Sequence, residues 1–221
     1  MAGKLHILGL SDIEIGFIYS PMVAERFQNI DLIISCGDLP YYYLEYIVSM
    51  LNVPMYYVRG NHASVVEITT AGERTSPWGA TDLHQRVIED DTGILLAGLE
   101  GSLQYNLGAY QYSQNQYWFK VFRLVPKLII NKLRFGRYLD IFVSHAPPWH
   151  IHDESDRPHQ GIKAFNWLID VFQPTYALHG HIHLYRSDAV TVTQVKQTRV
   201  VNVFGFKELE IDTPATRSRE R

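Results

Sequence analysis

The stretch Leu32-Ile33-Ile34-Ser35-Cys36-Gly37-Asp38 shows the pattern on which this chain is built. Its first four residues form an apolar run typical of a buried strand, and a glycine and a carboxylate follow shortly after it. A glycine precedes Asp38, Asn61 and His181, and because glycine has no side chain, the backbone can approach a crowded centre at all three places. The same order, an apolar run and then a polar motif, recurs at Ser11-Asp12-Ile13-Glu14, Arg59-Gly60-Asn61-His62, Ser144-His145-Ala146 and His179-Gly180-His181-Ile182-His183.

Further apolar runs extend this strand pattern along the chain. We predict strands at Leu5–Leu10, Leu32–Ser35, Met55–Val58, Ile94–Gly98, Leu139–Ser144, Tyr176–His179, Arg199–Val203 and Lys207–Ile211. Helical periodicity predicts helices at Pro21–Phe27, Tyr42–Leu51 and Gly161–Phe172. This alternation predicts an α/β layered domain with helices outside the sheets. Ligands of such folds bind beyond the carboxyl ends of strands, where each of the five motifs falls.

The bulk composition describes one globular domain. The chain has 221 residues, of which 46% are hydrophobic and 19% are charged, and its net charge of −3 gives no global basic field for nucleic acid. We expect a single domain over residues 1–212 and a flexible tail over 213–221. The single cysteine, Cys36, suits a reducing compartment, and no run of 18 apolar residues occurs. We therefore expect a cytoplasmic protein without a transmembrane segment.

The five motifs carry enough ligands for two metal ions. They supply carboxylates at 12, 14 and 38, a carboxamide at 61 and imidazoles at 62, 145, 181 and 183. A pair of divalent ions needs one ligand that bridges both, and Asp38 in the middle motif is the natural bridge. Asp12 and Glu14 alternate along an extended segment, so both reach one site only where the chain curls over it.

The motifs in this order resemble the calcineurin-like metallophosphoesterase family, whose motifs run D-x-H, GD, GNH, H and GHxH. The resemblance extends from Asp12 to His183, and the stretch that follows His145 is similar to a branch of small phosphodiesterases. It implies a four-layer αββα sandwich of two mixed β-sheets flanked by helices. It also implies metal ligands: Asp12, Glu14, Asp38 and His183 around the first ion, and Asp38, Asn61, His145 and His181 around the second.

The same resemblance implies the chemistry. Two divalent ions would provide a bridging hydroxide for attack on phosphorus, as in a dinuclear phosphoesterase. His62 would protonate the leaving group and Arg59 would clamp a phosphate oxygen. We expect a metal-dependent phosphoric ester hydrolase, a phosphodiesterase rather than a phosphatase, acting on a small phosphorylated or nucleotide-like substrate.

The chain departs from the family pattern at two positions. Glu14 stands where the family usually has histidine, which shifts the expected metal towards Mn²⁺ or Mg²⁺ and away from Fe²⁺ or Zn²⁺, or leaves the first site weak. The acidic partner that often orients the GNH histidine is also missing, because Ala63 follows His62 and Tyr41 stands three residues after Asp38. These departures support an alternative, a scaffold that has kept the fold and lost efficient catalysis.

Three features outside the ligand set leave alternatives open. The segment 115–138 carries six basic residues and no acidic one, interleaved with aromatic residues. The first interpretation is an amphipathic helix that caps the sandwich, and the second is a partner or oligomer surface. The third is a contact for anionic lipid or for nucleic acid. Contact with nucleic acid would favour a nuclease as the alternative function. His179 is expected to be a packed side chain rather than a ligand, and Cys36 a small buried side chain rather than a reactive thiol.

Overall fold

The computed structural model describes residues 3–69, 72–185 and 188–213. A first sheet contains β1 (Lys4–Ser11), β2 (Leu32–Ser35), β3 (Met55–Tyr57), β6 (Ala80–Asp82) and β15 (Gly205–Asp212). Its strands lie in the order β15-β1-β2-β3-β6. The pairs β1–β2, β2–β3 and β3–β6 are parallel, and β15 runs antiparallel to β1. The sheet is therefore mixed.

A second mixed sheet packs against the first. It contains β7 (Arg86–Glu89), β8 (Leu95–Leu99), β11 (Ile141–Ser144), β12 (Tyr176–His179), β13 (Val192–Val195) and β14 (Thr198–Asn202) in the order β13-β14-β12-β11-β8-β7. Its four inner strands are parallel to one another, and the edge strands β13 and β7 are antiparallel to their neighbours. Two short pairs lie apart, β4 (Glu67–Thr69) with β5 (Gly72–Arg74) and β9 (Ser102–Leu103) with β10 (Gln111–Tyr112).

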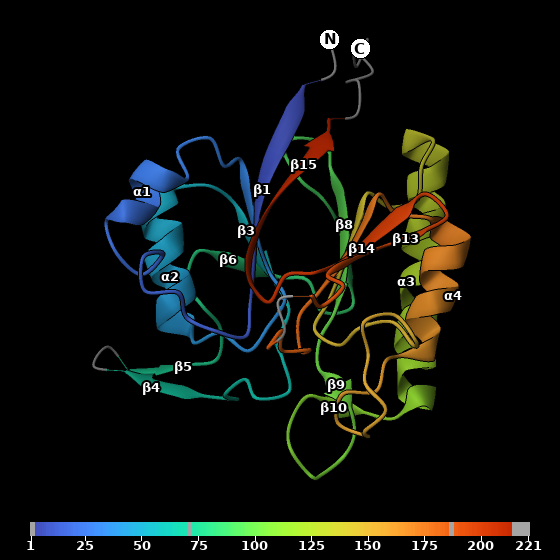
Figure 1. The fold of residues 1–221 in the computed structure, drawn as a ribbon. Helices are drawn as coiled ribbons and strands as arrows, with labels where there is room; N and C mark the ends of the chain where they lie inside the picture. Colours follow the sequence, from blue (N-terminus) through green and yellow to red (C-terminus); the bar gives the residue numbers. More distant parts are fainter. Residues whose placement is uncertain (1–2, 70–71, 186–187, 214–221) are drawn as a thin grey trace.

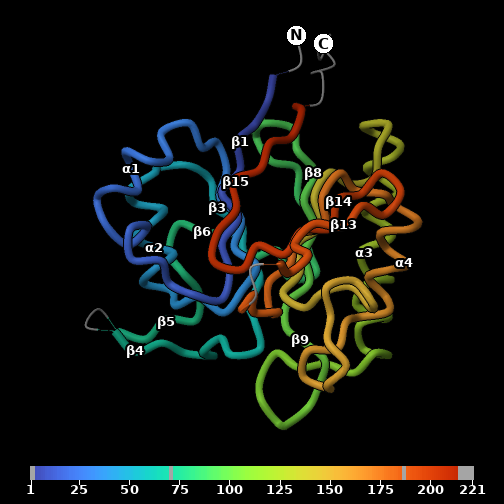
Figure 2. The backbone as a smooth tube through the Cα atoms, in the orientation of Figure 1, coloured from blue at the N-terminus to red at the C-terminus, as the bar shows by residue number. Residues whose placement is uncertain are grey.

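Helices cover the outer face of each sheet (Figure 1). The helices are α1 (Met22–Arg26), α2 (Tyr41–Leu51), α3 (Gln114–Phe135) and α4 (Lys163–Phe172). The tube view shows α1 and α2 on the side of the first sheet and α3 and α4 on the side of the second (Figure 2). The order of layers is helix, sheet, sheet, helix, so the predicted four-layer αββα sandwich is confirmed.

Three apolar cores separate the four layers because strand side chains alternate in direction. In β1, Leu5 and Ile7 enter the core between the two sheets, whereas Leu8 and Leu10 enter the core beneath α1 and α2. In β11, Val143 faces the core between the sheets and Phe142 faces the core beneath α3 and α4. Strands buried on both faces read as continuous apolar runs, which is why the sequence revealed them.

All eight predicted strands and all three predicted helices are confirmed, with ends displaced by at most two residues. The strands that the sequence did not reveal are short, and most are only partly buried, so they lack an apolar run. The first interpretation of segment 115–138 is confirmed, because α3 occupies most of it and packs against the second sheet and α4. Apart from Thr213, the predicted tail 213–221 lies outside the described residues. Across the described part of the chain, no helix has both the length and the apolar character needed to cross a membrane.

Candidate metal centre

The five motifs meet where the parallel strands of both sheets end. Asp12 follows β1, Asp38 follows β2 and Asn61 follows β3, whereas His145 follows β11 and His181 follows β12. Four of these side chains form a tight group around His145 Nε2. This atom lies 3.1 Å from Asp38 Oδ2, 3.0 Å from Asn61 Oδ1 and 3.1 Å from His181 Nδ1. The fold therefore brings the four proposed ligands of the second ion to one point.

The histidines of this group present nitrogen lone pairs to the same point. The other ring nitrogen of each lies 2.8 Å from a main-chain carbonyl: His145 Nδ1 from Cys36 O, and His181 Nε2 from Pro158 O. A carbonyl only accepts, so these nitrogens carry protons, and in the neutral rings His145 Nε2 and His181 Nδ1 are unprotonated. Two lone pairs 3.1 Å apart repel each other unless a proton or a cation lies between them. Metal-binding histidines are commonly held by such a hydrogen bond from the distal nitrogen, so the residues present fit a divalent ion.

The electrostatics of the group suit a cation. Burial alone would raise the pKa of Asp38, but the neighbouring His145 outweighs burial and lowers the pKa to about 2. Burial alone would lower the pKa of His145, but Asp38 reverses this and raises the pKa to about 9. Burial and the charge of His145 together lower the pKa of His181 to about 3. Without a metal, one proton on His145 takes the place of the cation, and His181 stays neutral.

The remaining proposed ligands are arranged less tightly. The main-chain N–H of His181 donates to both oxygens of Asp12, at 3.1 and 3.0 Å, and His183 Nε2 lies 3.8 Å from Asp12 Oδ1. Glu14 is exposed, and Tyr42 Oη donates to its carboxylate at 2.7 Å. Among the described residues, the structure shows no contact between Glu14 and the other proposed ligands. Its role as a ligand stays a prediction.

The glycines of the motifs permit this close approach. A side-chain carbon on Gly60 would collide with the Asp38 carboxylate, and one on Gly180 would collide with Ser11 and Asp12. At Gly37 it would meet the main chain of Gly60 at 2.6 Å and the His145 ring at 2.7 Å. The prediction that these glycines allow the backbone to approach a crowded centre is confirmed.

His62 lies at the edge of the group. Its main-chain N–H donates to Asp38 Oδ1 at 2.9 Å, and its side chain is exposed. Because its backbone is held by Asp38, the imidazole projects from a positioned loop towards solvent. Its role as proton donor stays a prediction.

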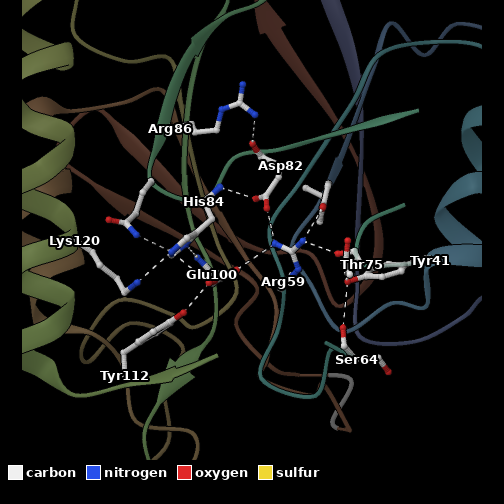
Figure 3. Close-up of polar contacts among 12 residues, drawn as sticks. Tyr41, Arg59, Ser64, Thr75, Asp82, His84, Arg86, Glu100, Tyr112 and Lys120 are labelled. Carbon is white, nitrogen blue, oxygen red and sulfur yellow. Dashed lines mark hydrogen bonds and ion pairs between the residues drawn. The ribbon is translucent and has the colours of Figure 1, made fainter. Parts of the chain in front are cut away.

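The side chain of Arg59 points towards Asp82 and Glu100 (Figure 3). Its guanidinium lies 2.5 Å from Asp82 Oδ2 and 3.5 Å from Glu100 Oε2, and it donates to the Thr75 carbonyl at 2.9 Å. Its main-chain carbonyl accepts from Gly101 N–H at 2.8 Å. These contacts anchor the 59–62 loop, and the clamp on a phosphate oxygen stays a prediction.

Some residues that support the centre were not found from the sequence. Tyr105 Oη accepts from Asn61 Nδ2 at 3.1 Å, which directs the amide oxygen of Asn61 towards His145. Tyr105 belongs to no motif, and only the fold places it beside Asn61.

His179 and Cys36 are buried, and His179 Nε2 contacts His152 Nδ1 at 2.9 Å, so their predicted packing is confirmed.

Comparison with known proteins identifies the class. The family model "Calcineurin-like phosphoesterase" matches residues 5–185, which is most of the chain. The protein therefore belongs to the calcineurin-like phosphoesterase family, as the motifs indicated.

Solved structures agree with the fold. The crystal structure of TT1561 of Thermus thermophilus superposes with a TM-score of 0.60 and 15% identity, covering 96% of this chain and 100% of that one. Another crystal structure superposes with a TM-score of 0.63 and 16% identity at the same coverage. At such identities the likeness shows the fold alone. A search of curated proteins found no match.

Proposed function

We propose that this protein is a dinuclear metal-dependent phosphoesterase that hydrolyses phosphodiesters of small or nucleotide-like substrates. One observation carries the proposal: two imidazole nitrogens, His145 Nε2 and His181 Nδ1, lie 3.1 Å apart beside a carboxylate and a carboxamide, in a chain of the phosphoesterase family. We assign Asp38, Asn61, His145 and His181 to one ion, and Asp12, Glu14, Asp38 and His183 to the other. Mn²⁺ is the proposed metal, because three of the four ligands in the set that contains Asp12 are carboxylates.

Divalent ions held there would polarise the phosphoryl group and activate water for hydrolysis. The protein supplies the rest. His62 is exposed on a loop fixed by Asp38, and in the proposed role it donates a proton to the departing alkoxide. A cleft of about 560 Å³ opens beside His183 and is lined in part by His150, Glu154 and Tyr185. It offers space and hydrogen-bonding groups for the second ester arm of a diester.

Metal reconstitution tests the proposal. The protein is stripped with chelator, Mn²⁺, Mg²⁺, Zn²⁺ or Fe²⁺ is restored separately, and hydrolysis of a chromogenic phosphodiester is compared with that of the matching monoester. We expect turnover highest with Mn²⁺, faster for the diester, and absent in Asp38→Ala. Retention of monoester hydrolysis without diester hydrolysis would refute the diester assignment. If the folded, metal-loaded protein hydrolyses neither substrate, the proposal that it is a phosphoesterase would be refuted.

A second candidate, a metal-binding scaffold with weakened catalysis, is favoured by one observation. Glu14 is exposed and bonded to Tyr42 rather than to another proposed ligand. Titration calorimetry with Mn²⁺ separates the two candidates. The hypothesis of an active enzyme predicts two bound ions per chain. Tyr42→Phe should retain both ions, because it removes the hydroxyl that bonds the Glu14 carboxylate. One ion per chain together with no turnover would favour the scaffold.

For the nuclease alternative, the cations of α3 lie beside an apolar face rather than along a polar track, so no observation favours it.

A further inference from the structure

Helix α3 is apolar on two opposite faces. Its inner face packs against the second sheet and α4 through Tyr117, Val121, Leu124 and Leu128, all of which are buried. Its outer face carries Phe119, Phe122, Ile129, Ile130 and Leu133, whose exposed fractions range from 48% to 81%. A helix that is apolar all round is normally buried on all sides. Within the described chain, Trp167 of α4 contacts Phe122, yet about half or more of each of these five side chains stays exposed.

The exposed apolar side chains form one continuous stripe. At about 100° per residue, these five residues and Pro126 project within an arc of about 100° on the side opposite the buried face. The stripe follows most of a helix of 22 residues, about 33 Å long at about 1.5 Å per residue. Figure 1 shows α3 lying lengthwise along one outer side of the molecule.

A row of cations borders the stripe on one side. Arg123, Lys127 and Arg134 project within an arc of about 40° next to it. Each is exposed, and within the described residues none has an ion pair. The helix has five basic residues and no acidic one, although the chain as a whole has a net charge of −3. The other two are engaged, because Lys120 Nζ contacts His84 at 3.1 Å and Lys132 Nζ donates to the Gly136 carbonyl at 2.8 Å.

We propose that the outer face of α3, defined by Phe119, Phe122, Ile129, Ile130 and Leu133 with Arg123, Lys127 and Arg134, docks on an anionic lipid bilayer. The helix lies parallel to the bilayer, with its apolar stripe among the upper acyl carbons and its cations beside lipid phosphates. Each cation near an anionic surface adds about 1 kcal/mol of attraction, which salt screens.

Charge complementarity favours lipid over a second copy of the chain. Another α3 has no acidic residue to pair with the three cations, and an antiparallel pair would place both cationic rows on the same side. A bilayer that contains anionic headgroups supplies the negative charge and the apolar phase together. This inference is independent of the proposed enzymatic function.

Vesicle cosedimentation tests the inference directly. Binding of the full chain is measured on phosphatidylcholine vesicles with and without about 30 mol% phosphatidylserine, at about 0.1 M and about 0.5 M salt. We expect at least about tenfold stronger binding to the anionic vesicles, weakened at high salt. The double variant Phe122→Ser/Leu133→Ser and the double variant Arg123→Glu/Lys127→Glu should each lose about tenfold or more. The control Ile68→Ser, at an 86% exposed position on β4, should bind like the wild type.

A site-specific probe separates docking from loss of structure. The native Cys36 is buried, so a polarity-sensitive maleimide dye on Leu133→Cys labels the introduced thiol selectively. Its emission should shift to the blue with anionic vesicles, whereas the same dye on Ile68→Cys should not respond. Circular dichroism of every variant should match the wild type.

Four outcomes would overturn the inference. They are equal binding to neutral and anionic vesicles, binding that survives both double variants, a dimer that Leu133→Ser dissociates in the absence of lipid, and salt-sensitive binding of an oligonucleotide with no binding of vesicles.

Discussion

At the scale of single residues, the candidate centre depends on unusual backbone conformations. Asp12, Asp38 and His181 have φ values of 70°, 54° and 67°, in the left-handed region that non-glycine residues rarely adopt. Each lies just beyond a parallel strand, where the chain must turn sharply to direct its side chain or main chain to the centre. Strain of this kind persists only where surrounding contacts hold it, and it gathers at functional sites. The clustered ligands provide those contacts.

Gly60→Ala tests how closely the backbone must approach Asp38. The added carbon would collide with the Asp38 carboxylate and force it to rotate. We expect Mn²⁺ affinity, measured by titration calorimetry, to fall by more than about tenfold, with about 1–3 kcal/mol lost from the free energy of unfolding. In Gly16→Ala the added carbon meets nothing within 4 Å, so this control should change neither quantity. Equal affinities in the two variants would contradict the expectation.

Tyr105→Phe tests the support of a ligand by a residue outside the motifs. Without the hydroxyl, the Asn61 amide loses the acceptor that orients its oxygen towards His145. Loss of such outer contacts typically lowers metal affinity, and we expect roughly a tenfold decrease in calorimetry, with unchanged circular dichroism. Tyr138→Phe is the matched control, because Tyr138 precedes β11 at the end opposite His145. An unchanged affinity in Tyr105→Phe would show that Asn61 needs no such support.

At the scale of elements, α3 shows how the face of a helix on which a side chain lies decides its contribution to the free energy of unfolding. The helix begins with a capping box, in which the side chains of Ser113 and Gln116 bond each other's main-chain N–H, and ends at Gly136 in a left-handed conformation. Between these ends, apolar residues face both the core and solvent. The two faces share the same helix caps and similar helix propensities, so only packing against the core distinguishes the stabilising effect of their side chains.

A pair of leucines in α3 measures this difference. Leu128 is fully buried, whereas Leu133 is 81% exposed. Leu128→Ala should lower the free energy of unfolding by about 2–5 kcal/mol because it leaves a cavity, and Leu133→Ala should change it by less than about 0.5 kcal/mol. Urea unfolding followed by circular dichroism, without lipid, provides the measurement. Similar losses in both variants would mean that the outer face is covered in solution.

At the scale of the whole molecule, a partly buried polar network joins the layers (Figure 3). Asp82 ends β6 of the first sheet, Glu100 follows β8 of the second sheet, and Lys120 lies on α3. Between them, His84 Nδ1 accepts from Glu100 N–H at 3.1 Å, and its Nε2 lies 3.3 Å from Glu100 Oε1. Arg59 extends the network to the 59–62 loop. The network therefore links three layers to the candidate centre.

His84 should make stability depend on pH. Burial, followed by the charge of Lys120, lowers its pKa from 6.5 to about 4. As the pH falls below 6.5, the unfolded chain takes up a proton that the folded protein does not, so stability is lost until the pH reaches about 4. The loss attributable to His84 is at most about 3 kcal/mol.

Urea unfolding of wild type and His84→Gln, from about pH 7.5 to about pH 4.5, isolates this contribution because other titrating groups are common to both. The wild type should lose more stability than the variant on acidification. Parallel curves would contradict the assignment.

The sequence by itself determined eight strands of the two sheets, the helices and the family, because strands buried on both faces leave continuous apolar runs and the ligand motifs follow such runs. It also determined which glycines must lack a side chain. Only the tertiary structure decided that Arg59 bonds Asp82, that Glu14 meets Tyr42, and that Tyr105 orients Asn61. These partners lie 23, 28 and 44 residues apart in the chain. Such contacts arise from packing between layers, and neither periodicity nor motif spacing records which distant side chains the packing brings together.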